Sequence, residues 1–389
     1  MNPVSKRMAV EKKFRVALIG CGRVGAWLED DPLRAKPATH MGGLQKLLNS
    51  PIHNKKNIKI ALTALCDIDE ERLQKCQERW NVPHAYTQYK ELIDKEKPDI
   101  VTIATWTATH HDIAVYAAQN GVKGIVLEKP VAVSIQQAEA VIQVCNANNV
   151  KLVINHERRW DPLYIKIKQL MNEGTLGPLK AVYGNVLSRT GAQGDWKKLI
   201  PAIGGGPLLH DGTHLVDMIR FFAGDIADIN GSVKREDKTL AVETSASAMM
   251  TTCSGVTVFL EAGGMRDYFN FELDLHFKEG RIKIGNGIRE FLVARESKRY
   301  SGFRDLVKKE FPEIKRDSDP FTGALLEVIK AIESDEEPFS SGRDGVKAME
   351  VIFAIYRSAS LKGKTVSLPL KPYARPVHPL IKMFKAGML

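Results

Sequence analysis

The first 155 residues alternate between short apolar runs and amphipathic stretches. The runs are rich in β-branched residues and end in polar or glycine-containing turns, which is typical of buried strands. The stretches between them repeat apolar positions at helical spacing, and two of them end at Asn81 and at Asn120–Gly121. This alternation predicts right-handed βαβ units and a parallel sheet. The predicted strands are Arg15–Ile19, Ile58–Leu65, Ile100–Ala104, Gly124–Leu127 and Lys151–Ile154, and two of the predicted helices are Glu70–Trp80 and His111–Asn120.

Beyond Asn155 the apolar runs become longer, and three of them follow one another with short polar turns between them. This pattern predicts a mostly antiparallel sheet. The predicted strands are Leu179–Leu187, Ala241–Thr252, Gly255–Gly263 and Phe269–Phe277. A helix is predicted over Pro162–Glu173, and two later helices, Phe321–Ser334 and Gly345–Ser360, are expected to pack back onto the body. We therefore predict an α/β chain with a parallel-sheet domain over residues 14–150 and a second α/β domain over residues 151–370.

The charge of the chain is concentrated at its two ends. The 389 residues contain 56 Lys+Arg and 46 Asp+Glu, a formal net charge of +10. A basic N-terminal arm, residues 1–13, carries +3, and residues 362–389 carry +6, so the body is close to neutral. The composition therefore does not indicate nucleic-acid binding. We expect the basic C-terminal tail, residues 371–389, to be solvated or to clasp another subunit, with docking to an anionic partner or membrane surface as the alternative.

The five cysteines form no CxxC pair, and no stretch reaches 18 consecutive apolar residues. The N-terminus has basic residues but no apolar segment that ends in a small-residue cleavage site. These features favour a reducing compartment and no membrane span, so we expect a cytoplasmic protein.

A glycine motif follows the first predicted strand directly. Residues 20–25 read Gly-Cys-Gly-Arg-Val-Gly, the G-x-G-x-x-G pattern that opens a dinucleotide-binding βαβ unit. Asp67 ends the next strand and can accept hydrogen bonds from both ribose hydroxyls, which favours NAD over NADP. It lies 42 residues after Gly25, where about 20 is usual, and we attribute the excess to loop insertions at Asp30–Thr39 and Asn49–Asn57.

Four further motifs follow the glycine motif in a characteristic order. They are residues 103–110 (IATWTATH), 127–130 (LEKP), 155–162 (NHERRWDP) and 204–217 (GGGPLLHDGTHLVD). In this order they resemble the glucose–fructose oxidoreductase, inositol dehydrogenase and MocA (Gfo/Idh/MocA) family, over residues 14–368. The resemblance implies an N-terminal Rossmann domain and a C-terminal α/β domain with a large, mostly antiparallel sheet. Family members typically use NAD(P) to oxidise or reduce a hydroxyl carbon of a sugar, inositol or sugar derivative, and commonly form dimers or tetramers through the sheet face.

By this resemblance, Lys129 is a catalytic residue that contacts the substrate and the nicotinamide ribose. The peptide before Pro130 is expected to be cis. Trp106 stands where the family more often has proline, and either stacks on cofactor or substrate or packs in the core. His110 is interpreted as structural or as lying near the cofactor. The expected cofactor-binding residues are Gly20, Gly22, Arg23, Val24, Gly25, Asp67, Thr105, Trp106, His110, Glu128 and Lys129.

The family's other catalytic position is His214, the general acid or base. Asp217 follows three residues later, so on a helix its carboxylate could orient the imidazole ring. The usual pattern has an aspartate four residues before this histidine, whereas this chain has His210 there and an acid one residue later, at Asp211. Because a shift by one residue points the side chain elsewhere, we expect His210 to face the substrate and share the proton-transfer or hydrogen-bonding role. Two histidines without a clear third ligand are a weak metal signal, and no metal is predicted.

Arg158 and Arg159 open the second domain and, by the resemblance, reach the cleft, the alternative being solvated arginines near a helix start. The predicted catalytic residues are thus Lys129, His214 and His210. The predicted substrate-binding residues are Lys129, Arg158, Arg159, His210, Asp211 and His214.

Three classes of function fit this sequence. The leading prediction is an NAD-dependent dehydrogenase or reductase that acts on a sugar, inositol or nucleotide-linked sugar and forms a homodimer or homotetramer. The first alternative is a non-catalytic NAD-binding regulator that responds to sugars, although such a protein does not need both Lys129 and His214. The second is an NAD-dependent glycoside hydrolase of the same fold, which would recycle its cofactor.

Overall fold

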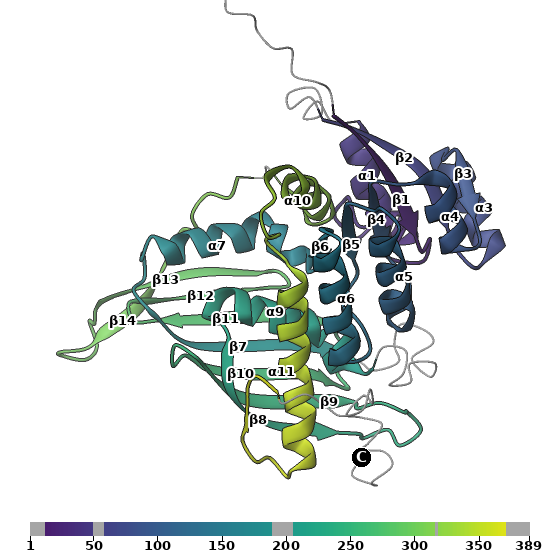
Figure 1. Cartoon of the computed structure of the whole chain (residues 1–389). Coiled ribbons are helices and arrows are strands. Elements are labelled where there is room, and N and C mark those ends of the chain that lie inside the picture. Colours follow the sequence, from purple (N-terminus) through teal and green to yellow (C-terminus); the bar gives the residue numbers. More distant parts are fainter. Residues whose placement is uncertain (1–11, 50–57, 189–204, 316–317, 371–389) are drawn as a thin grey trace, which may run out of the picture.

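The chain folds around two β-sheets. The computed structural model describes residues 12–49, 58–188, 205–315 and 318–370 (Figure 1). Most of the two basic terminal segments and the Asn49–Asn57 insertion lie outside these residues. Among the helices of the described part, none has the length and apolar character that crossing a bilayer requires.

The first sheet has six parallel strands in the order β3-β2-β1-β4-β5-β6. This is the order of a classic dinucleotide-binding fold, in which ligands bind beyond the carboxyl ends of the strands where the order reverses, here beside β1 and β4. The strands are β1 (Lys12–Ile19), β2 (Ile58–Cys66), β3 (His84–Tyr86), β4 (Ile100–Ile103), β5 (Gly124–Leu127) and β6 (Lys151–Ile154). The parallel sheet predicted from the sequence is confirmed.

The helices between these strands follow local sequence signals. Asp69 caps α3 by accepting a hydrogen bond from the Arg72 backbone N–H, and the helix ends at Asn81 in the left-handed conformation. The predicted stop at Asn120–Gly121 is also present, with Gly121 at φ +89°. The helices of this domain are α1 (His40–Leu48), α3 (Glu70–Trp80), α4 (Tyr89–Glu96), α5 (Thr107–Gln119) and α6 (Ile135–Ala147).

The first predicted insertion interrupts the helix that the glycine turn begins. After one turn of backbone hydrogen bonds the chain forms a short 3-10 helix, η1 (Trp27–Asp30), and then an irregular loop. The backbone N–H groups of His40 and Met41 donate to the carbonyls of Val24 and Gly25. These hydrogen bonds join α1 to the end of the glycine turn, so α1 takes the place of the helix that normally follows this turn. Residues 30–39 are therefore a loop insertion, as predicted, and no element has been lost.

The second sheet has nine strands in the order β14-β13-β12-β11-β7-β10-β9-β8-β15. It is mostly antiparallel, as expected, with one parallel pair in its middle. Strand β7 lies between β10 and β11 and pairs parallel with β10. The strands are β7 (Leu179–Ser188), β8 (Ile226–Lys234), β9 (Ser245–Thr252), β10 (Thr257–Gly264), β11 (Asn270–Phe277), β12 (Gly280–Gly285), β13 (Ile288–Glu296), β14 (Arg304–Lys309) and β15 (Val366–Ser367).

One face of this sheet is covered by helices. Helix α11 (Gly342–Ser360) runs across it in yellow in Figure 1 and contacts β8 so closely that a Cβ on Gly231 would lie 2.9 Å from the Ile355 carbonyl oxygen. Helix α9 (Gly212–Ala223) packs beside it through Leu215 and Ile219, which face Gly184 of β7. The remaining elements of this domain are η2 (Glu157–Trp160), α7 (Pro162–Asn172) and the short α8 (Pro207–His210).

Two elements from beyond residue 150 pack with the first sheet. Strand β6 belongs to the first sheet, so this domain extends past residue 150 to the end of β6. Helix α10 (Pro320–Ser334), although late in the chain, packs on β5, β6 and α1, and its Val328 side chain fills the space beside Gly124. The expectation that the late helices pack back onto the body is therefore confirmed, and α10 completes the first domain.

Candidate active site

The three motif glycines form a turn that is closed on one side and open on the other. Gly20 has φ +100°, and a Cβ there would lie 2.5 Å from the Ala104 carbonyl oxygen. A Cβ on Gly25 would overlap with the Gly20 carbonyl oxygen. By contrast, a Cβ on Gly22 would meet no atom within 4 Å. Gly20 and Gly25 are thus required by the turn itself, whereas Gly22 leaves a free approach to the backbone, as a bound pyrophosphate requires.

Asp67 follows β2 and faces this turn. Its Oδ2 accepts a hydrogen bond from the Cys21 backbone N–H at 2.8 Å, and the Arg72 guanidinium donates to both carboxylate oxygens, from Nε to Oδ2 at 3.0 Å and from Nη2 to Oδ1 at 2.6 Å. Burial pushes the pKa of Asp67 upward, but Arg72 and the backbone donors outweigh it and lower the pKa. An ionised carboxylate is therefore held beside the glycine turn, with the Arg72 cation next to it.

The loop after β4 lies at the same edge of the sheet. The side chain of Trp106 is 63% exposed, so the alternative of a packed core tryptophan is wrong. His110 is buried, with Nδ1 2.8 Å from the Pro130 carbonyl oxygen and Nε2 3.1 Å from the Thr105 carbonyl oxygen. His110 thus ties the loop after β4 to the loop after β5, and burial lowers its pKa.

Lys129 follows β5, and its peptide bond to Pro130 is cis, as expected. Its Nζ donates a hydrogen bond to the carbonyl oxygen of His210 at 3.1 Å, which brings the first domain's lysine against the segment that carries the histidines. Glu128 points away into a buried cluster, where its Oε1 accepts from Asn155 Nδ2 at 2.6 Å and lies 2.9 Å from His40 Nε2. Glu128 therefore anchors the strand end behind Lys129.

His214 lies in the first turn of α9 and faces a carboxylate from another element. Its Nδ1 is 3.1 Å from Oε2 of Glu157 in η2, close enough for a hydrogen bond, although the ring N–H is not aligned with the carboxylate. Burial is the main cause that lowers the pKa of His214 to about 4, and it outweighs the opposing effect of Glu157. The imidazole is therefore neutral near pH 7 and able to accept a proton.

His210 and Asp211 form a second histidine–carboxylate pair. His210 Nδ1 lies 2.9 Å from Asp211 Oδ1, and the His210 side chain is 45% exposed. Burial raises the pKa of Asp211, but His210, Lys129 and His214 together lower it well below its usual range. Lys129 thus contacts the segment that carries two histidines, each of which lies beside its own carboxylate.

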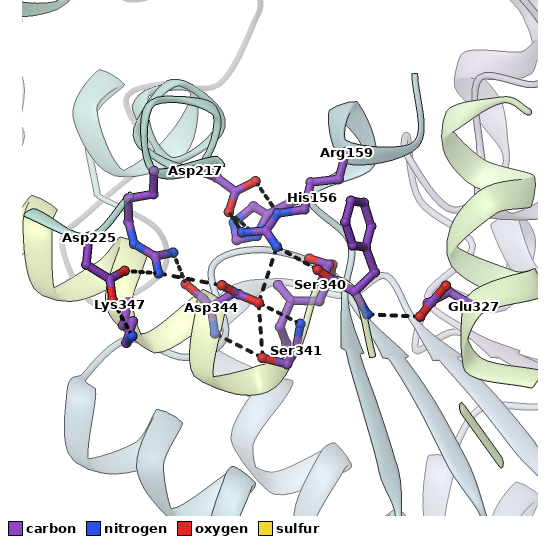
Figure 2. Close-up of polar contacts among 12 residues, drawn as sticks. His156, Arg159, Asp217, Asp225, Glu327, Ser340, Ser341, Asp344 and Lys347 are labelled. Atoms are coloured by element: carbon purple, nitrogen blue, oxygen red, sulfur yellow. Dashed lines mark hydrogen bonds and ion pairs between the residues drawn. The ribbon is translucent and has the colours of Figure 1, made fainter. Parts of the chain in front are cut away.

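The expectation that Asp217 orients His214 is wrong. Both Asp217 oxygens accept hydrogen bonds from Arg159, at 2.9 Å from Nε and 2.7 Å from Nη2, and His156 Nδ1 lies 3.3 Å away (Figure 2). Arg159, predicted to contact substrate, is buried in this cluster and also lies 3.2 Å from Asp344 of α11. The cause is competition for the carboxylate, because Arg159 of η2 holds both oxygens of the fully buried Asp217.

Arg158, the other arginine of the motif, lies at the surface of η2. Its Nη1 donates to Glu157 Oε1 at 2.6 Å, and its guanidinium carbon lies 4.2 Å from the centroid of the Phe271 ring. Both oxygens of Glu157 therefore face partners, Oε1 facing Arg158 and Oε2 facing His214.

Asp217→Asn should lower the free energy of unfolding by about 3–5 kcal/mol, because it leaves the buried Arg159 cation without its bidentate partner. Urea unfolding followed by far-UV circular dichroism measures this change. The matched control is Glu71→Gln at an exposed ion pair with Lys75, where a change within about 0.5 kcal/mol is expected. Equal effects of the two substitutions would contradict the importance of the buried pair.

Comparison with known proteins accounts for both domains. Residues 14–156 match the oxidoreductase family with an NAD-binding Rossmann fold, and residues 164–283 match the GFO/IDH/MocA C-terminal domain. The chain belongs to the GFO/IDH/MocA family. It is therefore an oxidoreductase of this family, with NAD as the favoured cofactor, and the glycine turn and Asp67 offer the backbone approach and ionised acceptor that NAD needs.

Individual relatives within the GFO/IDH/MocA family are distant. The chain is 25% identical to a D-apiose dehydrogenase of Paraburkholderia graminis over 94% of its length and 92% of that protein. It is also 25% identical to a myo-inositol 2-dehydrogenase of Thermotoga maritima over 90% of its length and 97% of that protein. Among solved structures, a levoglucosan dehydrogenase in complex with NADH has a TM-score of 0.75 at 19% identity, covering 92% of this chain and all of the other.

The sequence reasoning missed two residues that the structure places in the site. Glu157 lies inside the NHERRWDP motif but was passed over in favour of the two arginines beside it. Arg72 lies in the first turn of α3, which begins three residues after Asp67, and no spacing rule in the sequence indicated its contact with that carboxylate.

Proposed function

We propose that this protein is an NAD-dependent dehydrogenase or reductase of a sugar or polyol, with Lys129 and His214 as its catalytic residues. The observation that supports this proposal is the contact between Lys129 Nζ and the His210 carbonyl oxygen. This contact joins the Lys129 ammonium group, just beyond the carboxyl end of β5, to the segment that carries both histidines. We also assign substrate contacts to His210, Asp211 and Arg158, and leave Arg159 to the buried cluster.

When bound, NAD supplies the hydride acceptor for oxidation of a hydroxyl carbon. In that reaction the Lys129 ammonium donates a hydrogen bond to the substrate oxygen and stabilises the negative charge that develops on it. His214, neutral near pH 7, accepts the hydroxyl proton as general base, and donates it in the reverse direction.

A screen of sugars, inositols and nucleotide-linked sugars for NADH formation tests this function. We expect NADH to accumulate with at least one polyhydroxylated substrate, and NADH to bind more tightly than NADPH because the Asp67 carboxylate repels a 2′-phosphate. NAD that stays bound and cycles without net NADH would instead favour a glycoside hydrolase. NADH binding with no turnover of either kind would favour a regulator.

We further propose that the face of the nine-stranded sheet opposite α9 and α11 joins copies of this chain into a homodimer or homotetramer. Alternating residues project from it, and Tyr183, Met249 and Phe259 are 45%, 50% and 38% exposed. Tyr183 and Phe259 stack with ring centroids 4.9 Å apart, beside an open hollow of about 550 Å³. Exposed apolar side chains on the central strands of a sheet face favour burial of that face against a partner.

Phe259→Asp should convert the assembly into monomers, because a charge on each copy would be buried at the centre of the interface. Size-exclusion chromatography with light scattering gives the mass, to be compared with the 43.3 kDa of one chain. Ile165→Asp places the same charge at a partly exposed apolar residue of α7, on a helix outside this face, and should leave the mass unchanged. A monomeric wild-type protein would contradict the proposal.

We also propose a cytoplasmic location. Its support is the state of the five cysteines, all of which are free thiols, four of them buried.

A further inference from the structure

The acid that faces His214 comes from a different segment than the family pattern implies. The position four residues before His214 is occupied by His210, whose ring is paired with Asp211. Asp217, three residues after His214, is fully engaged by Arg159. The carboxylate at 3.1 Å from His214 Nδ1 belongs to Glu157, 57 residues earlier in the chain, in the η2 turn.

Two contacts hold η2 against α9 and set this distance. In the first, Glu157 faces His214. In the second, Arg159 donates two hydrogen bonds to Asp217, one helical turn further along α9. Arg159 also donates to the Phe339 carbonyl oxygen at 2.6 Å and lies 3.2 Å from Asp344, so η2 is anchored to α11 as well (Figure 2). Arg158 restrains the remaining oxygen of Glu157 at 2.6 Å. The carboxylate therefore has little freedom to turn away from the histidine.

We propose that Glu157 is the positioning residue of His214, which holds the proton on Nδ1 and leaves the Nε2 lone pair free for the substrate. An ionised carboxylate attracts an N–H group and repels a nitrogen lone pair, so at 3.1 Å it favours the proton on the ring nitrogen nearest to it. The same logic governs histidine–carboxylate pairs on unrelated folds, where removing the charge leaves the geometry intact but the wrong tautomer. This inference rests on the proposed function, in which His214 is the acid–base group.

The step balances with one substrate hydroxyl and one NAD. In oxidation the hydroxyl O–H bond breaks and its proton bonds to Nε2 of His214. Bound NAD would accept the hydrogen on the same carbon together with its electron pair, which would balance formation of the carbon–oxygen double bond. Glu157 stabilises the imidazolium that results, because the developing positive charge lies beside its negative charge.

The charged groups around this pair come from three segments. Lys129 follows β5, Arg158 belongs to η2, and Asp211 precedes α9; all three act electrostatically on His214 or Glu157. Lys129 and Arg158 oppose protonation of His214, whereas Glu157 favours it. Without Glu157, the two cations would oppose protonation of His214 more strongly.

Nitrogen-15 NMR of the histidine side chains tests the proposal without needing a substrate. The His214 signals are identified by their loss in His214→Gln. In the wild-type protein near pH 7 we expect the Nδ1–H tautomer, in Glu157→Gln a loss of this preference, and in Glu157→Asp its retention. Glu243→Gln is the matched control, because this buried glutamate of the same domain accepts hydrogen bonds from the Leu208 backbone and from Tyr356 through Oε1, which a glutamine oxygen can replace.

The tautomer in Glu243→Gln should be that of the wild type. An unchanged tautomer in Glu157→Gln, or an equal change in Glu243→Gln, would overturn the proposal. With a substrate from the screen, Glu157→Gln should lower kcat by roughly 10²–10⁴-fold with little change in KM, by analogy with other histidine–carboxylate pairs, and Glu157→Asp should restore part of it. If no substrate turns over, the proposed function fails while the tautomer result still decides the role of Glu157.

Discussion

Lys129→Ala should lower kcat by roughly 10³-fold while NADH still binds, since the substitution removes a charged donor from the oxygen on which charge develops. The glycine turn and Asp67 are separate from Lys129, so cofactor affinity, measured by NADH fluorescence, should change little. Turnover is followed by NADH absorbance with the substrate found in the screen. The loss of one hydrogen bond to the partly exposed His210 segment leaves the fold intact.

The control for this prediction is a lysine at the opposite end of β5. Lys123 precedes β5 as Lys129 follows it, is 60% exposed, and pairs with Asp99 at 2.7 Å. Lys123→Ala should leave kcat within about twofold of the wild type, because exposed ion pairs contribute little to structure. Wild-type turnover in Lys129→Ala would exclude this lysine from catalysis.

Gly22→Ala should weaken NADH binding by roughly tenfold or more, a loss of at least about 1.4 kcal/mol. The reason is steric: its Cβ would meet no protein atom within 4 Å and would instead occupy the open side of the turn, where the cofactor backbone must approach. For the same reason the thermal midpoint should stay at the wild-type value. Fluorescence titration and differential scanning fluorimetry measure the two quantities on one sample.

The neighbouring glycine provides the contrast. A Cβ on Gly25 overlaps with the Gly20 carbonyl oxygen, so Gly25→Ala should lower the thermal midpoint as well as the NADH affinity. Undiminished NADH affinity in Gly22→Ala would show that the cofactor does not approach this side of the turn.

The periodicity of the sequence predicted most elements because their signals are local. Helix α3 was predicted with its observed bounds, since Asp69 and Asn81 cap it within its own segment. Strands β5 and β6 likewise match their predicted ranges. The position of β7 between β10 and β11 was not predictable in this way. Strand order depends on which edges meet in space, and nothing within a single strand encodes its neighbour.

The site shows the same division. The glycine motif and Asp67 are recognisable from short segments, because a dinucleotide-binding turn requires glycines after one strand and an acid at the end of the next. Lys129 and His214 were predicted from the resemblance of the motifs that contain them to those of the family. The partner of His214 was assigned to Asp217 by helical spacing, and that assignment failed. Asp217 is fully buried, and its carboxylate is occupied by an arginine from another element.

By itself, the sequence determined the two-domain α/β architecture, the dinucleotide-binding turn and the family to which the chain belongs, because these depend on periodicity, caps and motifs within a few turns of chain. Only the tertiary structure decided which carboxylate faces which histidine, that α10 completes the first domain, and that Arg159 is buried in a charge cluster. The physical reason is that hydrogen bonds and ion pairs act over a few ångströms in space. Residues 157 and 214 meet through the packing of η2 on α9, and no local pattern records that contact.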